Sequence, residues 1–260
     1  TTGLKPDAGP QKAEGAGEGR TRWVFESANV PRVPYEMLPP RSEDIVGINL
    51  TTFESWDAVG RWYNDLTKGR DELGPELKKK LDEWVPEGLE RDETIGKLLA
   101  EVANTVRYTG LEFGLAALQP RDCNAVWEAG YGDCKDKSNL LRALLAERGI
   151  ESHLVLINAG HETPNREIPD YRDFNHCILA IPDASAESGY VFCDPTVEGA
   201  KPALLPPPDR NQDVLIIRPD RAEWAKTPVG TTDELNFVYE FELDQDGRMS
   251  GWVTVTAPGI

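Results

Sequence analysis

The chain has 260 residues, and its 28 basic and 45 acidic side chains give a formal net charge of −17. This charge disfavours nucleic-acid binding, because affinity for phosphates depends on Lys and Arg, and it disfavours anionic membrane surfaces. No apolar run reaches the roughly 18 residues that a membrane-spanning helix needs, so we expect no membrane insertion. The four cysteines form no CxxC pair, which argues against a zinc ribbon and a dense disulfide framework.

The first fifty residues carry weak structural patterns. Residues 1–20 are rich in Gly, Ala, Glu and Pro, a composition that predicts a flexible linker. Residues 21–26 alternate like a strand, and residues 45–53 are again strand-like. Four prolines between these two segments exclude a regular element there.

Three helices are predicted next, over residues 55–69, 74–85 and 92–108. Ser55 is a suitable N-cap for the first helix. Apolar side chains recur at helical spacing in the first and third segments, and we expect them to form core rather than a cofactor site. They are Trp56, Val59, Trp62, Tyr63, Leu66, Ile95, Leu98, Leu99, Val102 and Val106.

The second half of the chain predicts an antiparallel sheet packed on a helix. A short helix opened by Pro120 precedes a longer one over residues 134–148, and Gly149 suits the position after its end. Strands are expected at residues 151–158, 174–182, 189–196 and 214–217. Residues 235–256 predict a hairpin that turns at Asp246 and Gly247. The predicted fold class is therefore α+β.

Cys134 stands at the start of the longer helix, in the segment YGDCKDK. The positive end of the helix dipole and the free N–H groups of the first turn favour a thiolate, which is the form that attacks a carbonyl carbon. Asp133 is a natural N-cap, and Gly132 permits a close approach. The alternative is a small buried apolar residue, but the polar residues 135–137 make burial at the helix start less expected.

His176 and Asp194 are predicted on neighbouring antiparallel strands. If they lie opposite each other, the same register sets Cys177 opposite Cys193. Side chains alternate across a sheet, so the imidazole and the carboxylate would share one face and the two thiols the other. Asp194 would then hold one ring nitrogen of His176 and leave the other for Cys134.

Two further questions stay open at this point. Cys177 and Cys193 could be buried thiols, a cross-strand disulfide, or zinc ligands together with the nucleophile and the imidazole, although alternation points His176 away from both cysteines. Trp127 is the candidate donor to a transition-state oxyanion. A Trp on a short helix is, however, also typical of a core.

The segments YGDCKDKSNLLRALLAERGI, FNHCILAIP and VFCDPT resemble the transglutaminase-like core of bacterial proteins. VRYTGLEFG, ahead of them, is similar to the run found in the subgroup with an N-terminal β-domain of unknown function. The resemblance covers roughly residues 21–260, and its specific motifs lie within 106–196. It implies a papain-like or transglutaminase-like fold and a Cys–His–Asp triad at Cys134, His176 and Asp194.

The resemblance also implies a domain division. Residues 21–53 would end an N-terminal β-domain, 54–220 would form the core, and 221–260 would begin a C-terminal β-domain. Family members are commonly exported, which favours a periplasmic or secreted location. Some animal relatives need calcium, but no EF-hand-type loop is present in the sequence, so we expect no metal and no cofactor.

The function expected from these residues is thiol-dependent acyl transfer on peptide or isopeptide amides. A thioester on Cys134 would be resolved by water or by an amine, and water is favoured because it needs no second binding site. The expected partner is a peptide or protein substrate, and the sequence does not set the oligomeric state. The alternatives are a non-catalytic scaffold in an envelope protein and a small-molecule acyltransferase, which the lack of a Gly-rich phosphate loop disfavours.

Overall fold

The structure is a computed structural model that describes residues 11–13, 22–24, 50–110, 114–160, 163–230 and 236–256. Gln11–Ala13 (β1) pairs with Arg22–Val24 (β2), which confirms the strand expected at 21–26. β1 lies within residues 1–20, where a flexible linker is expected from the composition, and its pairing uses backbone groups, which need no particular side chains. Of the strand expected at 45–53, only residues 50–53 are described, and they are irregular.

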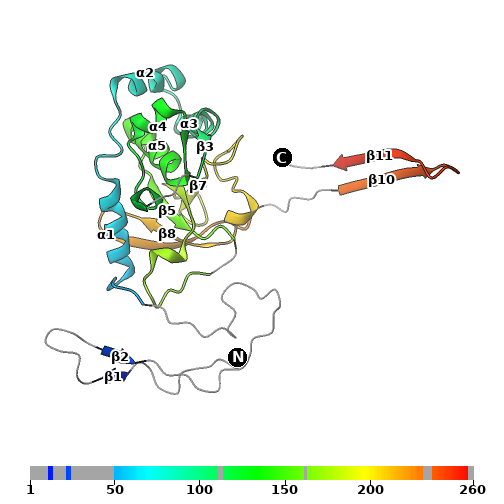
Figure 1. Cartoon of the computed structure of the whole chain (residues 1–260). Helices are drawn as coiled ribbons and strands as arrows, with labels where there is room; N and C mark the ends of the chain where they lie inside the picture. Colours follow the sequence, from blue (N-terminus) through cyan, green and yellow to red (C-terminus); the bar gives the residue numbers. More distant parts are fainter. Residues whose placement is uncertain are drawn as a thin grey trace.

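Helices make up one layer of the core (Figure 1). The α-helices of the described residues are Trp56–Thr67 (α1), Pro75–Trp84 (α2), Arg91–Thr105 (α3), Cys123–Ala129 (α4) and Cys134–Glu147 (α5). Ser55 caps α1 as predicted, since its Oγ accepts the N–H of Ala58 at 3.1 Å. α4 begins later than Pro120, because the Asp122 carboxylate accepts the first free N–H groups and sets the start at Cys123.

A five-stranded antiparallel sheet forms the second layer, in the order β7-β6-β5-β8-β9. Its strands are His153–Ile157 (β5), His176–Pro182 (β6), Tyr190–Cys193 (β7), Asp213–Ile217 (β8) and Ala222–Lys226 (β9). The predicted core boundary at residue 220 falls inside the β8–β9 hairpin, so the core sheet extends to Lys226. α1 packs closely on this last strand, because a Cβ added at Gly60 would lie 2.9 Å from the Cβ of Ala222.

The sheet is buried on both faces. Leu156 and Leu179 point into a cluster that includes the buried sides of all five helices. Ile178 and Phe192, at alternating positions, join a second cluster that Leu205 covers from the segment before β8. Each face is therefore apolar, and polar groups that enter this region must come from the ends of the strands.

Short elements connect these layers. Arg107–Tyr108 (β3) and Tyr131–Gly132 (β4) form a two-residue parallel pair that ties the end of α3 to the residues just before α5. Single turns of 3-10 helix occur at Gly114–Ala117 (η1), Tyr171–Asp173 (η2) and Pro207–Asp209 (η3). η3 carries an aspartate toward the start of β6, which matters for the site described below.

The terminal hairpin matches its prediction. Asn236–Leu243 (β10) pairs with Met249–Thr256 (β11), and every residue of both strands is exposed. Gly247 has a φ of 78°, and the Asp244 carboxylate accepts the N–H groups of Asp246 and Arg248 at the turn. None of the helices in the described ranges combines the length and the apolar character that a membrane crossing requires.

Candidate active site

Cys134 is the first residue of α5, and Asp133 is its N-cap. The Asp133 carboxylate accepts the N–H of Asp136 at 3.2 Å, and the Asp136 carboxylate in turn accepts the N–H of Asp133. This reciprocal capping box fixes the direction in which the chain enters the helix. The prediction that polar neighbours would keep the helix start exposed is wrong, since Cys134 is only 6% exposed and residues 135–137 are more deeply buried.

The buried polar side chains at the start of α5 are tolerated because each has a partner. Asp136 accepts the Arg121 guanidinium N–H at 2.8 Å, and Lys135 forms an ion pair with Asp133. The Lys137 ammonium donates to two backbone carbonyls at the end of α3, at 3.1 and 2.6 Å. Burial lowers the pKa of Lys137 to about 8. These contacts lock the first turn of α5 against α3 and α4 and so fix the position of the Cys134 thiol.

His176 is the first residue of β6, and Asp194 directly follows the last residue of β7. The predicted register is wrong by two residues, because Cys193 lies opposite Leu179 rather than opposite Cys177. The connection covers residues 183–189, where the Asp183 N–H donates to the carbonyl of Gly189 and Gly189 takes a positive φ, so the turn is centred one residue later than the predicted register requires. A shift of two residues preserves the face on which a side chain lies. His176 and Asp194 therefore still meet, at one end of the β6–β7 pair.

The three predicted side chains are in contact. His176 Nε2 lies 3.2 Å from Asp194 Oδ2, and the ring also forms a side-chain hydrogen bond with Cys134. Because Nε2 faces Asp194, the nitrogen left for the thiol is Nδ1. Asp194 Oδ1 accepts the N–H and the hydroxyl of Thr196 at 2.8 and 2.7 Å, so the carboxylate is held on both oxygens.

This contact favours a charged imidazole. Burial alone would lower the pKa of His176, but the hydrogen bonds to Asp194 and Cys134 and their negative charge outweigh it and raise the pKa to about 10. Burial raises the pKa of Asp194, and the hydrogen bond and charge of His176 more than reverse that effect, so the net direction is downward. The Asp194 carboxylate and the Cys134 sulfur therefore flank a charged imidazole.

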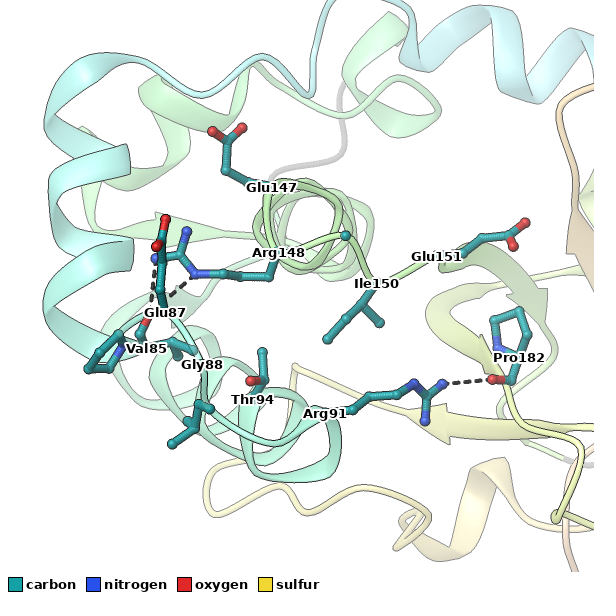
Figure 2. Close-up of a pocket in the computed structure, with 13 residues that line it drawn as sticks. Val85, Glu87, Gly88, Arg91, Thr94, Glu147, Arg148, Ile150, Glu151 and Pro182 are labelled. Atoms are coloured by element: carbon teal, nitrogen blue, oxygen red, sulfur yellow. Dashed lines mark hydrogen bonds between the residues drawn. The ribbon is translucent and has the colours of Figure 1, made fainter.

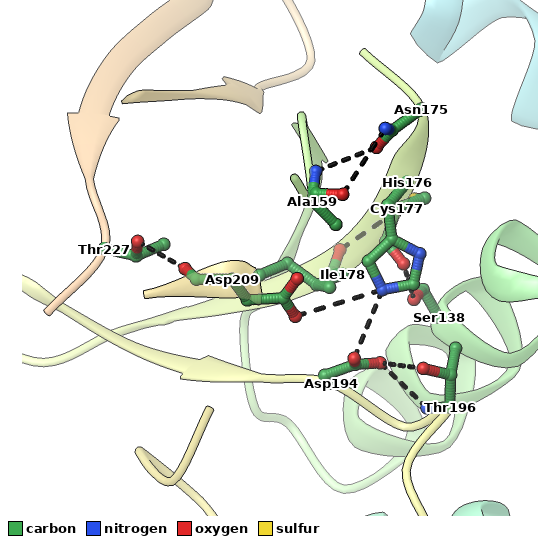
Figure 3. A network of polar contacts seen from close by, with 10 residues as sticks. All are labelled: Ser138, Ala159, Asn175, His176, Cys177, Ile178, Asp194, Thr196, Asp209 and Thr227. Atoms are coloured by element: carbon green, nitrogen blue, oxygen red, sulfur yellow. Dashed lines mark hydrogen bonds and ion pairs between the residues drawn. The ribbon is translucent and has the colours of Figure 1, made fainter. Parts of the chain in front are cut away.

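A second carboxyl group, Asp209 of η3, lies beside the same imidazole (Figure 3). Its Oδ2 is 3.9 Å from His176 Nε2, and the residue is 1% exposed. Asp209 is not among the predicted site residues, because an Asp after three prolines and before an Arg is an ordinary loop signal. Burial and the charge of Asp194 raise the pKa of Asp209 to about 7, although His176 acts in the opposite direction.

The His176 ring nitrogen and one oxygen from each of Asp194 and Asp209 lie within 4.8 Å of one another. These are the atoms in the described residues that could hold a metal ion. A cation bound there would need the lone pair of Nε2 and would replace the bond between the imidazole and Asp194. We assign no metal to this group and treat it as a hydrogen-bonded set.

A small cavity of about 110 Å³ lies against the thiol and the imidazole. Its walls are mostly apolar and aromatic, and they come from α1, η1, α5, β5 and the segment that leads into β6. The lining residues are Tyr63, Ala117, Leu118, Cys134, Lys135, Leu156, Tyr171, Phe174, Asn175, His176 and Cys177. The cavity can receive a small, largely apolar group beside the Cys134 sulfur.

Trp127, the predicted oxyanion donor, is not brought to this site. Its ring packs edge-on against Trp84 at a centroid distance of 5.0 Å, at the edge of the helical core. Trp127 does not line the cavity beside Cys134. In the first turn of α5, the N–H groups of Cys134 and Lys135 have no partner within the helix, and they are the donors that this turn offers to an oxyanion.

The other three cysteines are free and buried. Burial raises the pKa values of Cys123, Cys177 and Cys193 to about 12. Of the three arrangements considered for Cys177 and Cys193, the structure has two separate buried thiols. Neither belongs to the cluster of possible metal donors around His176.

A larger cavity of about 630 Å³ lies at the opposite end of α5, where Arg148 and Gly149 contribute to its wall (Figure 2). A helix of this length separates its two ends by about 20 Å. Arg148 donates to the carbonyl of Val85 at 2.9 Å, and Arg91 donates to that of Pro182 at 2.7 Å. Both guanidinium groups therefore hold the cavity wall together, and none of the triad residues lines this cavity.

Comparison with known proteins gives a similar fold. Neither a family model nor a curated protein matches this sequence. A crystal structure of a proposed protease from Parabacteroides distasonis ATCC 8503 has a similar fold, with a TM-score of 0.59 and 14% sequence identity. The match covers 86% of this chain and 41% of that protein, so this chain spans less than half of its length. At this level of identity the chain shares an α+β fold with a structure described as a protease.

Proposed function

We propose that this chain is a thiol-dependent amide hydrolase of the transglutaminase-like type, from the subgroup with an N-terminal β-domain. The observation that carries the proposal is the continuous side-chain contact from Cys134 through His176 to Asp194, with the sulfur at a helix N-terminus. Nucleophile, base and orienting carboxylate in this order are the parts that acyl transfer requires. The similarity to a structure described as a protease supports the same chemistry.

The proposed mechanism begins with proton transfer from the Cys134 thiol to His176 Nδ1. The thiolate attacks the carbonyl carbon of the substrate amide, and the N–H groups at the start of α5 stabilise the oxyanion. His176 then gives its proton to the leaving nitrogen, which departs as a free amine. The acyl group remains on Cys134 as a thioester.

Water completes the cycle in the proposed reaction. His176 takes a proton from the water molecule as it attacks the thioester carbonyl, and the same proton returns to the sulfur when the acid leaves. The net reaction consumes one water and yields one carboxylic acid and one amine. Attack by a primary amine instead of water would give transglutamination from the same thioester.

Asp194 acts through His176 in this proposal. Its hydrogen bond to Nε2 fixes the ring and stabilises the positive charge that forms when Nδ1 takes the proton. The proposal places the substrate acyl group in the cavity beside Cys134, and it includes a peptide or protein substrate and an extracytoplasmic location.

The test uses casein, a protein rich in peptide bonds and in Gln. The chain is incubated with casein and a fluorescent primary amine, and both released peptides and amine incorporation are followed. We expect release of peptides, or of ammonia without uptake of the amine, together with a covalent acyl adduct on Cys134 by mass spectrometry, and loss of these signals in Cys134→Ala. Incorporation of the amine, with ammonia as the leaving group, would replace hydrolysis by transglutamination, and the absence of any acyl adduct would overturn the proposal.

A further inference from the structure

Asp209 is buried beside the catalytic pair without a hydrogen-bond donor of its own. Its Oδ2 has no partner among the described residues, apart from the 3.9 Å ion-pair contact with His176 Nε2. The Asp194 carboxyl group is in hydrogen-bonding contact with that of Asp209, and oxygen atoms of the two groups lie within 4.8 Å of each other. Two carboxylates can form such a bond only when one of them carries a proton.

The proton of this pair belongs on Asp209. Asp194 Oδ2 faces His176, and its Oδ1 accepts two bonds from Thr196, so its charged form is stabilised on both oxygens. The Lys137 ammonium on α5 also acts on Asp194. The Asp209 carboxyl has none of these donors, and Thr227 bonds only to its backbone oxygen. Asp194 therefore stays ionised while Asp209 holds the proton.

We propose that Asp209 is a positioning residue for the acyl transfer argued above: its protonated carboxyl donates a hydrogen bond to Asp194 and so holds Asp194, and through it the His176 ring, in the orientation that serves Cys134. The inference rests on the proposed function for its chemical meaning. Its evidence is the geometry of the three side chains, which Figure 3 shows around the imidazole.

Loss of the Asp209 proton would remove the hydrogen bond that orients Asp194. An ionised Asp209 cannot donate to Asp194, and the two like charges repel each other. Its charge would also compete with Asp194 for His176 Nε2, which lies 3.9 Å from one carboxylate and 3.2 Å from the other. The ring would then lose its single orientation toward Cys134. Besides the groups already named, the thiol of Cys134 is the remaining titratable group in contact with the imidazole.

The test compares the wild type with Asp209→Asn and Asp209→Leu. An Asn amide can donate to Asp194 at every pH, whereas a Leu of similar size can never donate. The measured quantity is the second-order rate constant for alkylation of Cys134 by iodoacetamide, read at that residue by mass spectrometry between pH 5.5 and 8.5. The ratio of the rate constants of two proteins at the same pH removes the effect of every ionisation that both proteins share.

We expect Asp209→Asn and the wild type to react at similar rates at pH 6, and the variant to become about tenfold faster than the wild type at pH 8.5, which is the worth of one hydrogen bond to a charged group. Asp209→Leu should be about tenfold slower than the wild type at pH 6 and no slower than it at pH 8.5, where the ionised Asp209 of the wild type competes with Asp194 for the ring. A ratio of Asn variant to wild type that stays constant across this range would overturn the inference.

A second measurement follows the wild-type protein and uses Asp209→Asn only to assign a resonance. In wild-type protein with 13C-labelled Asp carboxyl groups, one carboxyl resonance that is absent from Asp209→Asn should titrate near neutral pH, and the His176 ring resonances should move with it. Titration of that resonance with the ordinary aspartates would refute the assignment of the proton to Asp209.

The outcomes separate this inference from the proposed function, because alkylation requires no substrate. If the ratio changes with pH as described and casein gives no acyl adduct, Asp209 positions an activated thiol and the hydrolase proposal fails. If casein gives the adduct and the ratio is constant, the hydrolase proposal stands and the role of Asp209 is rejected.

Discussion

Asp194→Asn is the change that most directly tests how the imidazole is charged. The wild-type pKa of His176 is about 10 against an ordinary value of 6.5, after burial has acted in the opposite direction. This difference corresponds to about 5 kcal/mol in favour of the charged ring. The hydrogen bond and charge of Asp194 and those of Cys134 share the effect. If Asp194 supplies about half, its loss costs roughly 2 kcal/mol, or about thirtyfold in the proton affinity of the ring.

The assay is the pH titration of the His176 ring resonances by NMR. We expect the ring of Asp194→Asn to lose its proton at a pH about 1.5 units below that of the wild type. Thr196→Val is the matched control, because it removes one of the two Thr196 donors to Asp194 and leaves the charge in place. Equal titration midpoints for the Asp194 variant and the wild type would refute the argument that Asp194 sets the charge on the ring.

The same pKa has a consequence for stability. The charged form of His176 is favoured in the folded chain, so the folded state binds a proton that the unfolded state releases above about pH 6.5. This contribution to stability is complete below pH 6.5 and is lost as the pH rises toward 10. Urea unfolding at pH 6 and pH 9.5 should show a smaller pH dependence in Asp194→Asn than in the wild type.

Three further results are expected. In urea unfolding at pH 8, Asp209→Asn should be more stable than the wild type by roughly 2–4 kcal/mol. The reason is that the folded-state pKa of Asp209 is about 7, so the wild type loses stability as the pH rises from about 4 to 7. The expectation is contradicted if the free energies of unfolding of the two proteins change equally with pH. Gly60→Ala should lower the free energy of unfolding by about 1–3 kcal/mol, because the new methyl group crowds Ala222. Gly96→Ala is the control and should not destabilise the protein, because the space at its Cβ is open. Similar melting temperatures for the two variants would argue against close packing of α1 on β9. In native protein at pH 8, Cys134 alone should be alkylated, because burial holds the pKa of the other three thiols near 12; modification of another cysteine would show that the core opens.

The parts that the sequence predicted correctly depend on local signals. Ser55 and Asp133 were recognised as N-caps because the groups they bond lie three residues away. The final hairpin was recognised because its alternation and its Asp–Gly turn are contained in one short segment. Helix caps and tight turns are decided by neighbouring residues, and a single sequence is sufficient to identify them.

The features that were missed depend on distant contacts. The two-residue error in the strand register came from a connection whose length is set by the fold of residues 183–189. Burial of Lys137 could not be foreseen, because its partners are carbonyls 31 and 34 residues earlier in the chain. Asp209 reaches His176 from a proline-rich turn that follows a separate strand. Composition and periodicity carry no information about which loop returns to a given strand end.

The buried charges around the start of α5 contribute more to fixing the position of Cys134 than to the stability of the fold. Asp133, Lys135 and Asp136 are each less than 5% exposed, next to a large apolar core. Removing such groups from water is costly, and apolar replacements of a buried ion pair are often as stable or more stable. An apolar first turn would keep the helix but would lose the capping box that fixes the direction of its N–H groups. Since Cys134 is the first residue of this helix, the polar anchors are explained by the need to hold a nucleophile and the neighbouring N–H groups in one fixed geometry.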